Sequence, residues 1–418
     1  GASTSKKLLA AIAVLAVAFA VFAAIPAAVD DSDAAEPVGV YYVGGKSAND
    51  ENAGTTTDAA LATIAAALAK EDVSKIVLAG NITECITIDA GKDVTIDLAG
   101  YKITNKDVTS SPSNANSTIF VNGTLTIDDS SSAKSGEVVM THEGNNGMAA
   151  LYVTATGTVT INGGYFHNAY ALSYYVVKNL GTVTINDGKF YNESVGKDGS
   201  NPSSVIANGY SGSKESNGVE NPVAKMTITG GEFKGKAYVK NDYFGEMTIT
   251  GGTFDVGKIR GAAIANQSKL TIGDGNGKVP SFTFDNAMGA VVLNYFWQDN
   301  DTPETADKNP VLTVNGLTAN GDAGALVGIT SDSCPFGTVK VKDKNVWTGA
   351  IIDEKNTTFS GTVEIGNDKV QFTNVKAGAS GIVVKAGSVE ITGTLDASAV
   401  AAQIAAAAGD VVLKDLTI

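Results

Sequence analysis

Apolar and polar residues alternate in a short phrase that recurs through most of the chain. In residues 158–166 (TVTINGGYF), Val159 and Ile161 alternate with threonines. Residues two apart share one face of a strand, so the phrase predicts a strand with an apolar face and a threonine face. The Asn-Gly-Gly that follows suits the positive φ values of a tight turn, after which Phe166 is expected to point inward again.

Close variants of the phrase return at residues 182–190, 226–233 and 247–254, and looser versions begin at Thr124, Leu270, Leu312, Thr338, Thr362 and Ser388. The equivalent isoleucines recur at steps of 21 to 43 residues, at Ile127, Ile161, Ile185, Ile228, Ile249 and Ile272. A unit of this length cannot bury its own apolar face and must stack on its neighbours. The repeat therefore predicts a solenoid.

A second predicted strand precedes each phrase and ends in asparagine, at Asn122, Asn179, Asn208, Asn241, Asn266 and Asn294. Stacked at about 4.8 Å per rung, these side chains could hydrogen-bond to one another as a ladder. Short parallel strands with an internal asparagine ladder resemble the right-handed parallel β-helix. The resemblance extends to adhesin-like surface proteins of archaea and bacteria built on that fold. We expect an all-β chain with one β-helix over residues 38–418.

Two helices are expected beside the rungs. Residues 57–70 read as an amphipathic helix with Thr57 as its N-cap and Leu61, Ile64 and Leu68 on one face. Lying before the first full rung, it would cap the open end of the solenoid. Predicted strands follow at 75–78, 82–88 and 94–98. Near the end, residues 396–408 read as an alanine-rich helix, and residues 411–418 as a last strand.

The start of the chain holds 18 consecutive apolar residues, 8–25, after Lys6-Lys7. Residues 1–29 suit either a retained helix or a secretory signal cut near Ala34, and residues 30–37 an acidic tether. A short polar start, an apolar helix and an outer domain resemble archaeal type IV pilins and archaellins, although Lys6 and Lys7 depart from that pattern. The resemblance implies a filament core built by Leu8, Leu9, Ile12, Leu15, Phe19, Phe22 and Ile25.

The composition narrows the function classes. The net charge of −14 argues against nucleic acid as a partner, which needs clustered lysine and arginine. The two histidines, His142 and His167, lack metal-ligand spacing, and Asp128-Asp129 reads as a turn. No Ser-His-Asp order, phosphate loop or metal motif stands out. We expect no catalytic residues, no metal site, no cofactor and no enzymatic activity.

Insertions are predicted at residues 209–224, 295–309, 330–337 and 353–361, where loops often carry binding surfaces. Tyr295, Phe296 and Trp297 form an aromatic loop that could pack locally, contact another subunit or stack on a glycan. Four sequons fall in predicted loops and are candidate glycosylation sites, at Asn116, Asn192, Asn300 and Asn356. Cys85 and Cys334 lie too many rungs apart for a disulfide within one chain, which leaves buried thiols or a bridge between subunits.

These patterns favour a structural subunit of an extracellular, pilus-like surface filament, with the chain itself as its partner and surface glycans or neighbouring cells as further ones. A secreted adhesin or surface-layer protein with a cleaved signal is the first alternative. A polysaccharide lyase or hydrolase is the second.

Overall fold

The chain divides into two compact units, Gly1–Val38 and Gly39–Ile418. Every helix and strand described below lies in the second unit. The computed structural model describes residues 38–108, 113–142, 147–169, 174–192, 204–210, 215–216, 219–258, 262–283, 290–294, 311–314, 317–320, 327–329, 338–341, 351–353, 358–365, 368–376, 382–386, 389–393 and 411–414. The expected assembly helix, the aromatic loop at Tyr295–Trp297, the helix over 396–408 and Cys334 lie outside these residues.

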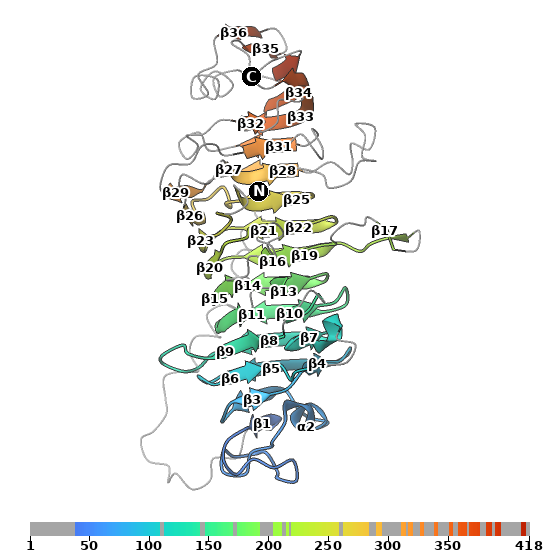
Figure 1. Ribbon diagram of the computed structural model, residues 1–418, viewed down its shortest axis with the longest axis vertical. Helices are drawn as coiled ribbons and strands as arrows, with labels where there is room; N and C mark the ends of the chain where they lie inside the picture. Colours follow the sequence, from blue (N-terminus) through green and yellow to red (C-terminus); the bar gives the residue numbers. More distant parts are fainter. Residues whose placement is uncertain are drawn as a thin grey trace, which may run out of the picture. The chain divides into compact units, whose positions relative to one another are not determined.

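Three sheets, which we name A, B and C, are built from stacked parallel strands (Figure 1). Sheet A runs through β1 (Val40–Val43), β2 (Lys75–Leu78), β5 (Asp93–Asp97), β8 (Thr124–Asp128), β11 (Thr158–Ile161), β14 (Thr182–Ile185), β19 (Ala224–Ile228), β22 (Gly245–Ile249), β25 (Lys269–Ile272), β28 (Val311–Val314), β31 (Thr338–Val341) and β33 (Thr358–Ile365).

Sheet B comprises β3 (Ile82–Thr83), β6 (Lys102–Thr104), β9 (Glu137–Met140), β12 (Tyr165–Asn168), β15 (Lys189–Asn192), β20 (Glu232–Gly235), β23 (Thr253–Asp255), β26 (Ser281–Thr283) and β29 (Thr318–Asn320). Sheet C comprises β4 (Ile86–Ile88), β7 (Ile119–Val121), β10 (Ala149–Val153), β13 (Tyr175–Asn179), β16 (Ser204–Asn208), β21 (Val239–Asn241), β24 (Ala262–Asn266), β27 (Ala290–Asn294), β30 (Val327–Ile329) and β32 (Ile351–Asp353). From β2 to β30 each turn of chain adds one strand to each sheet, which is the arrangement of a parallel β-helix.

The alternation in the repeated phrase sets the register of sheet A. The six equivalent isoleucines, from Ile127 to Ile272, are direct cross-strand partners, as predicted. Val159 and Ile161 are almost completely buried, whereas Thr158 and Thr160 lie on the outer face. Each turn therefore buries its apolar positions only because the next turn covers them.

Phenylalanines from sheet B form a continuous stack inside the solenoid. Phe166, Phe190, Phe233, Phe254 and Phe282 are nearly fully buried, and their ring centroids are separated by 5.1, 4.9, 4.5 and 5.0 Å. The inward orientation predicted for the first four is confirmed. Gly164 (φ 103°) and Gly188 (φ 129°) form the turns before Phe166 and Phe190 in a backbone conformation that favours glycine.

The first helix is shorter than predicted. α2 covers Ile64–Leu68, and its N-cap is Thr63, whose side chain accepts a hydrogen bond from Ala66 N. Leu61 cannot join it, because its N–H donates to Tyr42 O and its carbonyl accepts from Gly44 N, which makes it a bridge partner of β1. Leu61, Ile64 and Leu68 still share the interior, within the same apolar cluster as the first turns.

The parallel order ends before the chain does. β33 pairs antiparallel with β34 (Asp368–Lys376), and β35 (Ile382–Ala386) pairs antiparallel with β36 (Val389–Gly393). The phrase beginning at Ser388 is therefore part of a hairpin, and its prediction as a parallel rung is wrong. The last strand, β37 (Val411–Lys414), lies between β34 and β35 rather than at the end of the sheet.

Two predicted insertions have described strands in them. β17 (Glu215–Ser216) and β18 (Val219–Glu220) form an antiparallel pair within residues 209–224, between β16 and β19 (Figure 1). The insertion at 353–361 is shorter than predicted, because Asp353 ends β32 and Thr358 already begins β33.

Candidate ligand-binding face

The asparagine ladder lies in the interior and is structural. Asn179 Nδ2 donates to Asn208 Oδ1 at 2.7 Å, Asn208 Nδ2 to Asn241 Oδ1 at 2.9 Å, and Asn241 Nδ2 to Asn266 Oδ1 at 2.9 Å. All four side chains are completely buried. Asn294 is the cross-strand partner of Asn266. These hydrogen bonds satisfy side-chain polar groups that would otherwise be costly to bury.

Asn122 does not belong to this column, so its assignment to the ladder is wrong. The cross-strand partners of Asn179 lead back through Val153 to Val121, one residue before Asn122. Because a shift of one residue reverses the side chain's face, Asn122 leaves the interior. Its Oδ1 accepts from Thr154 Oγ1 at 2.9 Å instead.

The outer face of sheet B carries aromatic and charged side chains from several adjacent strands. On β6, β9, β12, β15 and β20 a buried isoleucine, valine or phenylalanine is preceded by a residue that faces outward. The register places Lys102, Glu137, Tyr165, Lys189 and Glu232 in one row across the strands. It places His167, Tyr191 and Lys234 in a second row. We call these eight residues the sheet B strip.

Rings and charges of the strip hold one another in place. Tyr165 stacks on His167 at 4.1 Å between centroids and meets Tyr191 edge-on at 5.0 Å. Glu137 Oε2 lies 3.0 Å from His167 Nε2 and 3.3 Å from Lys102 Nζ. Tyr191 donates its hydroxyl proton to Glu232 Oε1 at 2.6 Å. These contacts, with the ion pair between Glu232 and Lys234, connect seven of the eight strip residues across adjacent strands.

The ionisation of the strip follows from these contacts. The hydrogen bond from Lys234, followed by that from Tyr191, lowers the pKa of Glu232. The same bond to Glu232 raises the pKa of Lys234. Burial and then the bond to Glu232 raise the pKa of Tyr191. Near neutral pH the strip therefore presents a carboxylate, an ammonium and a neutral phenol within one contact group.

A groove of about 390 Å³ adjoins the strip at the turn between sheets A and B. Four of its eight lining residues are glycines, Gly163, Gly164, Gly188 and Gly231. Lys134, Asp187, Lys189 and Glu232 complete its lining. Lys189 and Glu232 belong both to the groove and to the strip, so the two features form one continuous surface.

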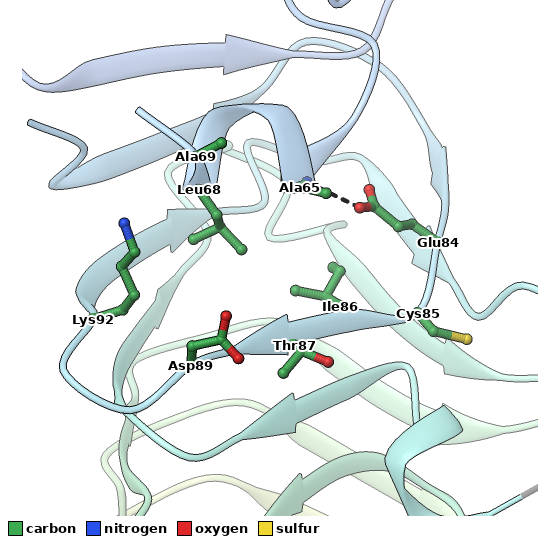
Figure 2. Close-up of a pocket in the computed structure, with 9 residues that line it drawn as sticks. All are labelled: Ala65, Leu68, Ala69, Glu84, Cys85, Ile86, Thr87, Asp89 and Lys92. Carbon is green, nitrogen blue, oxygen red and sulfur yellow. Dashed lines mark hydrogen bonds between the residues drawn. The ribbon is translucent and has the colours of Figure 1, made fainter. Parts of the chain in front are cut away.

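A second pocket, of about 510 Å³, lies where α2 meets β4 (Figure 2). Glu84 accepts hydrogen bonds from Ile64 N at 2.8 Å and Ala65 N at 2.9 Å, so its carboxylate already serves the start of the helix. Burial raises the pKa of the Cys85 thiol, and its Sγ lies 3.3 Å from Lys106 O. Local hydrogen bonds account for the positions of Glu84 and Cys85. The Cys85 side chain is half-buried rather than enclosed.

The described glycosylation candidates differ in their surroundings. Asn192 is not in a loop: it ends β15, is completely buried and donates its Nδ2 to Ser204 O at 2.9 Å. That prediction is wrong, because the nitrogen that would carry the glycan is inside the fold. Asn116 is half-exposed in a short 3-10 helix, η1 (Asn114–Asn116), and stays a candidate. Asn300 and Asn356 lie outside the described residues.

The two histidines and the Asp pair occupy separate places. His142 Nδ1 lies 3.5 Å from Asp107 Oδ1, and His167 belongs to the strip. Asp129 is buried and accepts from Gly100 N and Gly136 N, so it organises a turn. Within the described ranges no three His, Cys, Asp or Glu residues are grouped as metal ligands would be.

The described part of the chain also holds no helix with the length and apolar character needed to span a bilayer.

Comparisons of this chain with protein-family models, with curated proteins and with solved structures found no match.

The predictions from the sequence did not bring the residues of the strip together. A usable signal was present in the triplets YFH, KFY and EFK, at residues 165–167, 189–191 and 232–234. Once the central phenylalanine is assigned to the interior, its two neighbours must face outward. Stacking the triplets in register would have brought the aromatic and charged residues together.

Proposed function

We propose that this protein is a structural, adhesive subunit of an extracellular cell-surface filament. Hydrophobic N-terminal segments, residues 8–25, would form the filament core, and right-handed β-helix units would form its outer surface. The observation that supports this proposal best is the unbroken order of sheet A from β1 to β33. A stack in which each turn covers the last is suited to an extended body that displays outward faces. The chain would act mainly by packing and contact rather than by catalysis.

The spacing of the strip carboxylates favours contact over hydrolysis. Glu137 and Glu232 are three cross-strand steps apart, through Tyr165 and Lys189. At about 4.8 Å per step they are separated by about 14 Å. Glycoside hydrolases with two catalytic carboxylates hold them about 5–9.5 Å apart. This pair therefore gives no support to a polysaccharide-cleaving enzyme.

The proposal is tested by negative-stain imaging of native surface material, with mass spectrometry of the chain's N-terminus in the same sample. Filaments whose chains keep residues 8–25 are expected. Chains that begin near Ala35, in sheets or as free monomers, would overturn the filament and leave the secreted adhesin or surface-layer protein.

A further inference from the structure

We propose that the sheet B strip and the adjoining groove, which glycines partly line, bind a neutral polysaccharide chain. This deepens the adhesive part of the proposed function by assigning its site and ligand class. It does not require that the chain assemble into filaments. The proposal rests on the residue types of the strip, their fixed geometry and the continuity of strip and groove.

The residue types argue against a protein or a nucleic acid as the ligand of the strip. The centre of a protein–protein interface is depleted of charged residues, whereas Lys102, Glu137, Lys189, Glu232 and Lys234 make up most of the strip. Nucleic acid needs a surplus of cations, but the strip mixes both signs within a chain of net charge −14. A ligand rich in hydroxyl groups can instead donate to carboxylates, accept from ammonium groups and lie against tyrosine rings.

The fixed geometry lowers the entropy that binding would cost. Each tyrosine of the strip already has a ring neighbour, and Lys234 Nζ lies 5.1 Å from the centroid of Tyr191. Ordering flexible side chains is a principal cost of association, so contacts held before binding favour affinity.

The groove supplies room for a linear ligand beside the strip. Glycines from three successive turns line it, and Gly188 and Gly231 have φ values of +129° and +99°. A side chain at either position would be strained, so both positions favour glycine. Lys189, which is exposed, and Glu232 lie where the groove meets the strip. The charges around the groove are balanced, Lys134 and Lys189 against Asp187 and Glu232, which favours a neutral chain over an anionic one.

The test is calorimetric binding of the full chain to cellohexaose and chitohexaose, with hexagalacturonate as the anionic probe. At least one neutral hexasaccharide is expected to bind. Tyr165→Ala should weaken that binding by about tenfold or more, the loss typical of an interface aromatic. Lys189→Ala, at an exposed position where folding is not at risk, should weaken it by about two- to fivefold.

Lys225→Ala is the matched control, because Lys225 is an exposed lysine on the outer face of sheet A. It should leave the affinity unchanged. The proposal is overturned if neither neutral probe binds, if only hexagalacturonate binds, or if Lys225→Ala weakens binding as much as Lys189→Ala. Filament imaging gives an independent result, so a failure of the glycan site and a failure of assembly are distinguishable.

Discussion

Individual buried carboxylates in this chain accept hydrogen bonds from the backbone N–H groups of turns. Asp97, only 3% exposed, accepts from Ala99 N at 3.1 Å and from Ser130 N at 2.9 Å, and its Oδ2 lies 3.1 Å from Lys75 Nζ. Burial alone would raise the pKa of Asp97, but the bond from Ser130 N, followed by that from Lys75, brings it below its ordinary value of 3.8. These partners therefore favour the ionised form in the folded chain.

This direction predicts how Asp97 contributes to stability. Because its folded pKa lies below its unfolded value, the stabilisation is present above pH 3.8 and is lost as the pH falls through the folded pKa. Asp97→Asn should lower the free energy of unfolding by about 1–3 kcal/mol at neutral pH, since it loses charge-assisted hydrogen bonds. The difference should shrink below pH 3.8 in chemical denaturation across pH. A difference that stays constant with pH would show that the charge of Asp97 does not contribute.

At the scale of elements, the repeated apolar positions could be predicted from the sequence. Features that depend on strand register or on tertiary contacts could not. The apolar positions of sheet A and the inward phenylalanines follow from alternation alone, because every rung imposes the same burial. Asn122 was misassigned because its motif, IFVN, resembles VVKN at Asn179 although the two are offset by one residue. The length of α2 was overestimated because a tertiary pairing of Leu61 with β1 overrides its local helical pattern.

The sheet B strip was predictable only in part, because its contacts also depend on strand register. The outward direction of Tyr165, Tyr191 and Lys234 follows from the strand period. Their mutual contacts depend on which turn stacks on which, and loops of unequal length between phrases obscure that order in the sequence. The groove depends on glycines with positive φ that align only after the register is known.

The asparagine ladder yields a prediction at this scale. Asn208→Ala removes the acceptor of Asn179 Nδ2 and the donor to Asn241 Oδ1 in a completely buried place. We expect a loss of at least about 2 kcal/mol in the free energy of unfolding, because buried polar groups lose partners on both sides. Asn122→Ala, outside the column, should cost less in the same denaturant titration. Equal losses for the two variants would contradict the register that places Asn122 outside the column.

For the molecule as a whole, stacking implies that a local defect should weaken nearby turns most. Each described turn from β2 to β30 pairs with the turns directly before and after it, so stability is expected to depend on neighbouring rungs. Phe233 offers a test, because its ring lies between Phe190 at 4.9 Å and Phe254 at 4.5 Å in the central stack. Phe233→Ala should cost about 3–5 kcal/mol, since the stack cannot close over the missing ring.

Hydrogen exchange measured by mass spectrometry would show how far that loss extends. Amides of β15, β20 and β23 should lose the most protection, and those of β5 and β6, several turns away, the least. Phe233→Leu keeps an apolar side chain of similar size and should produce the same gradient with a smaller amplitude. If protection falls equally in β5 and β20, the turns unfold as one cooperative unit, and the nearest-neighbour account of this solenoid is wrong.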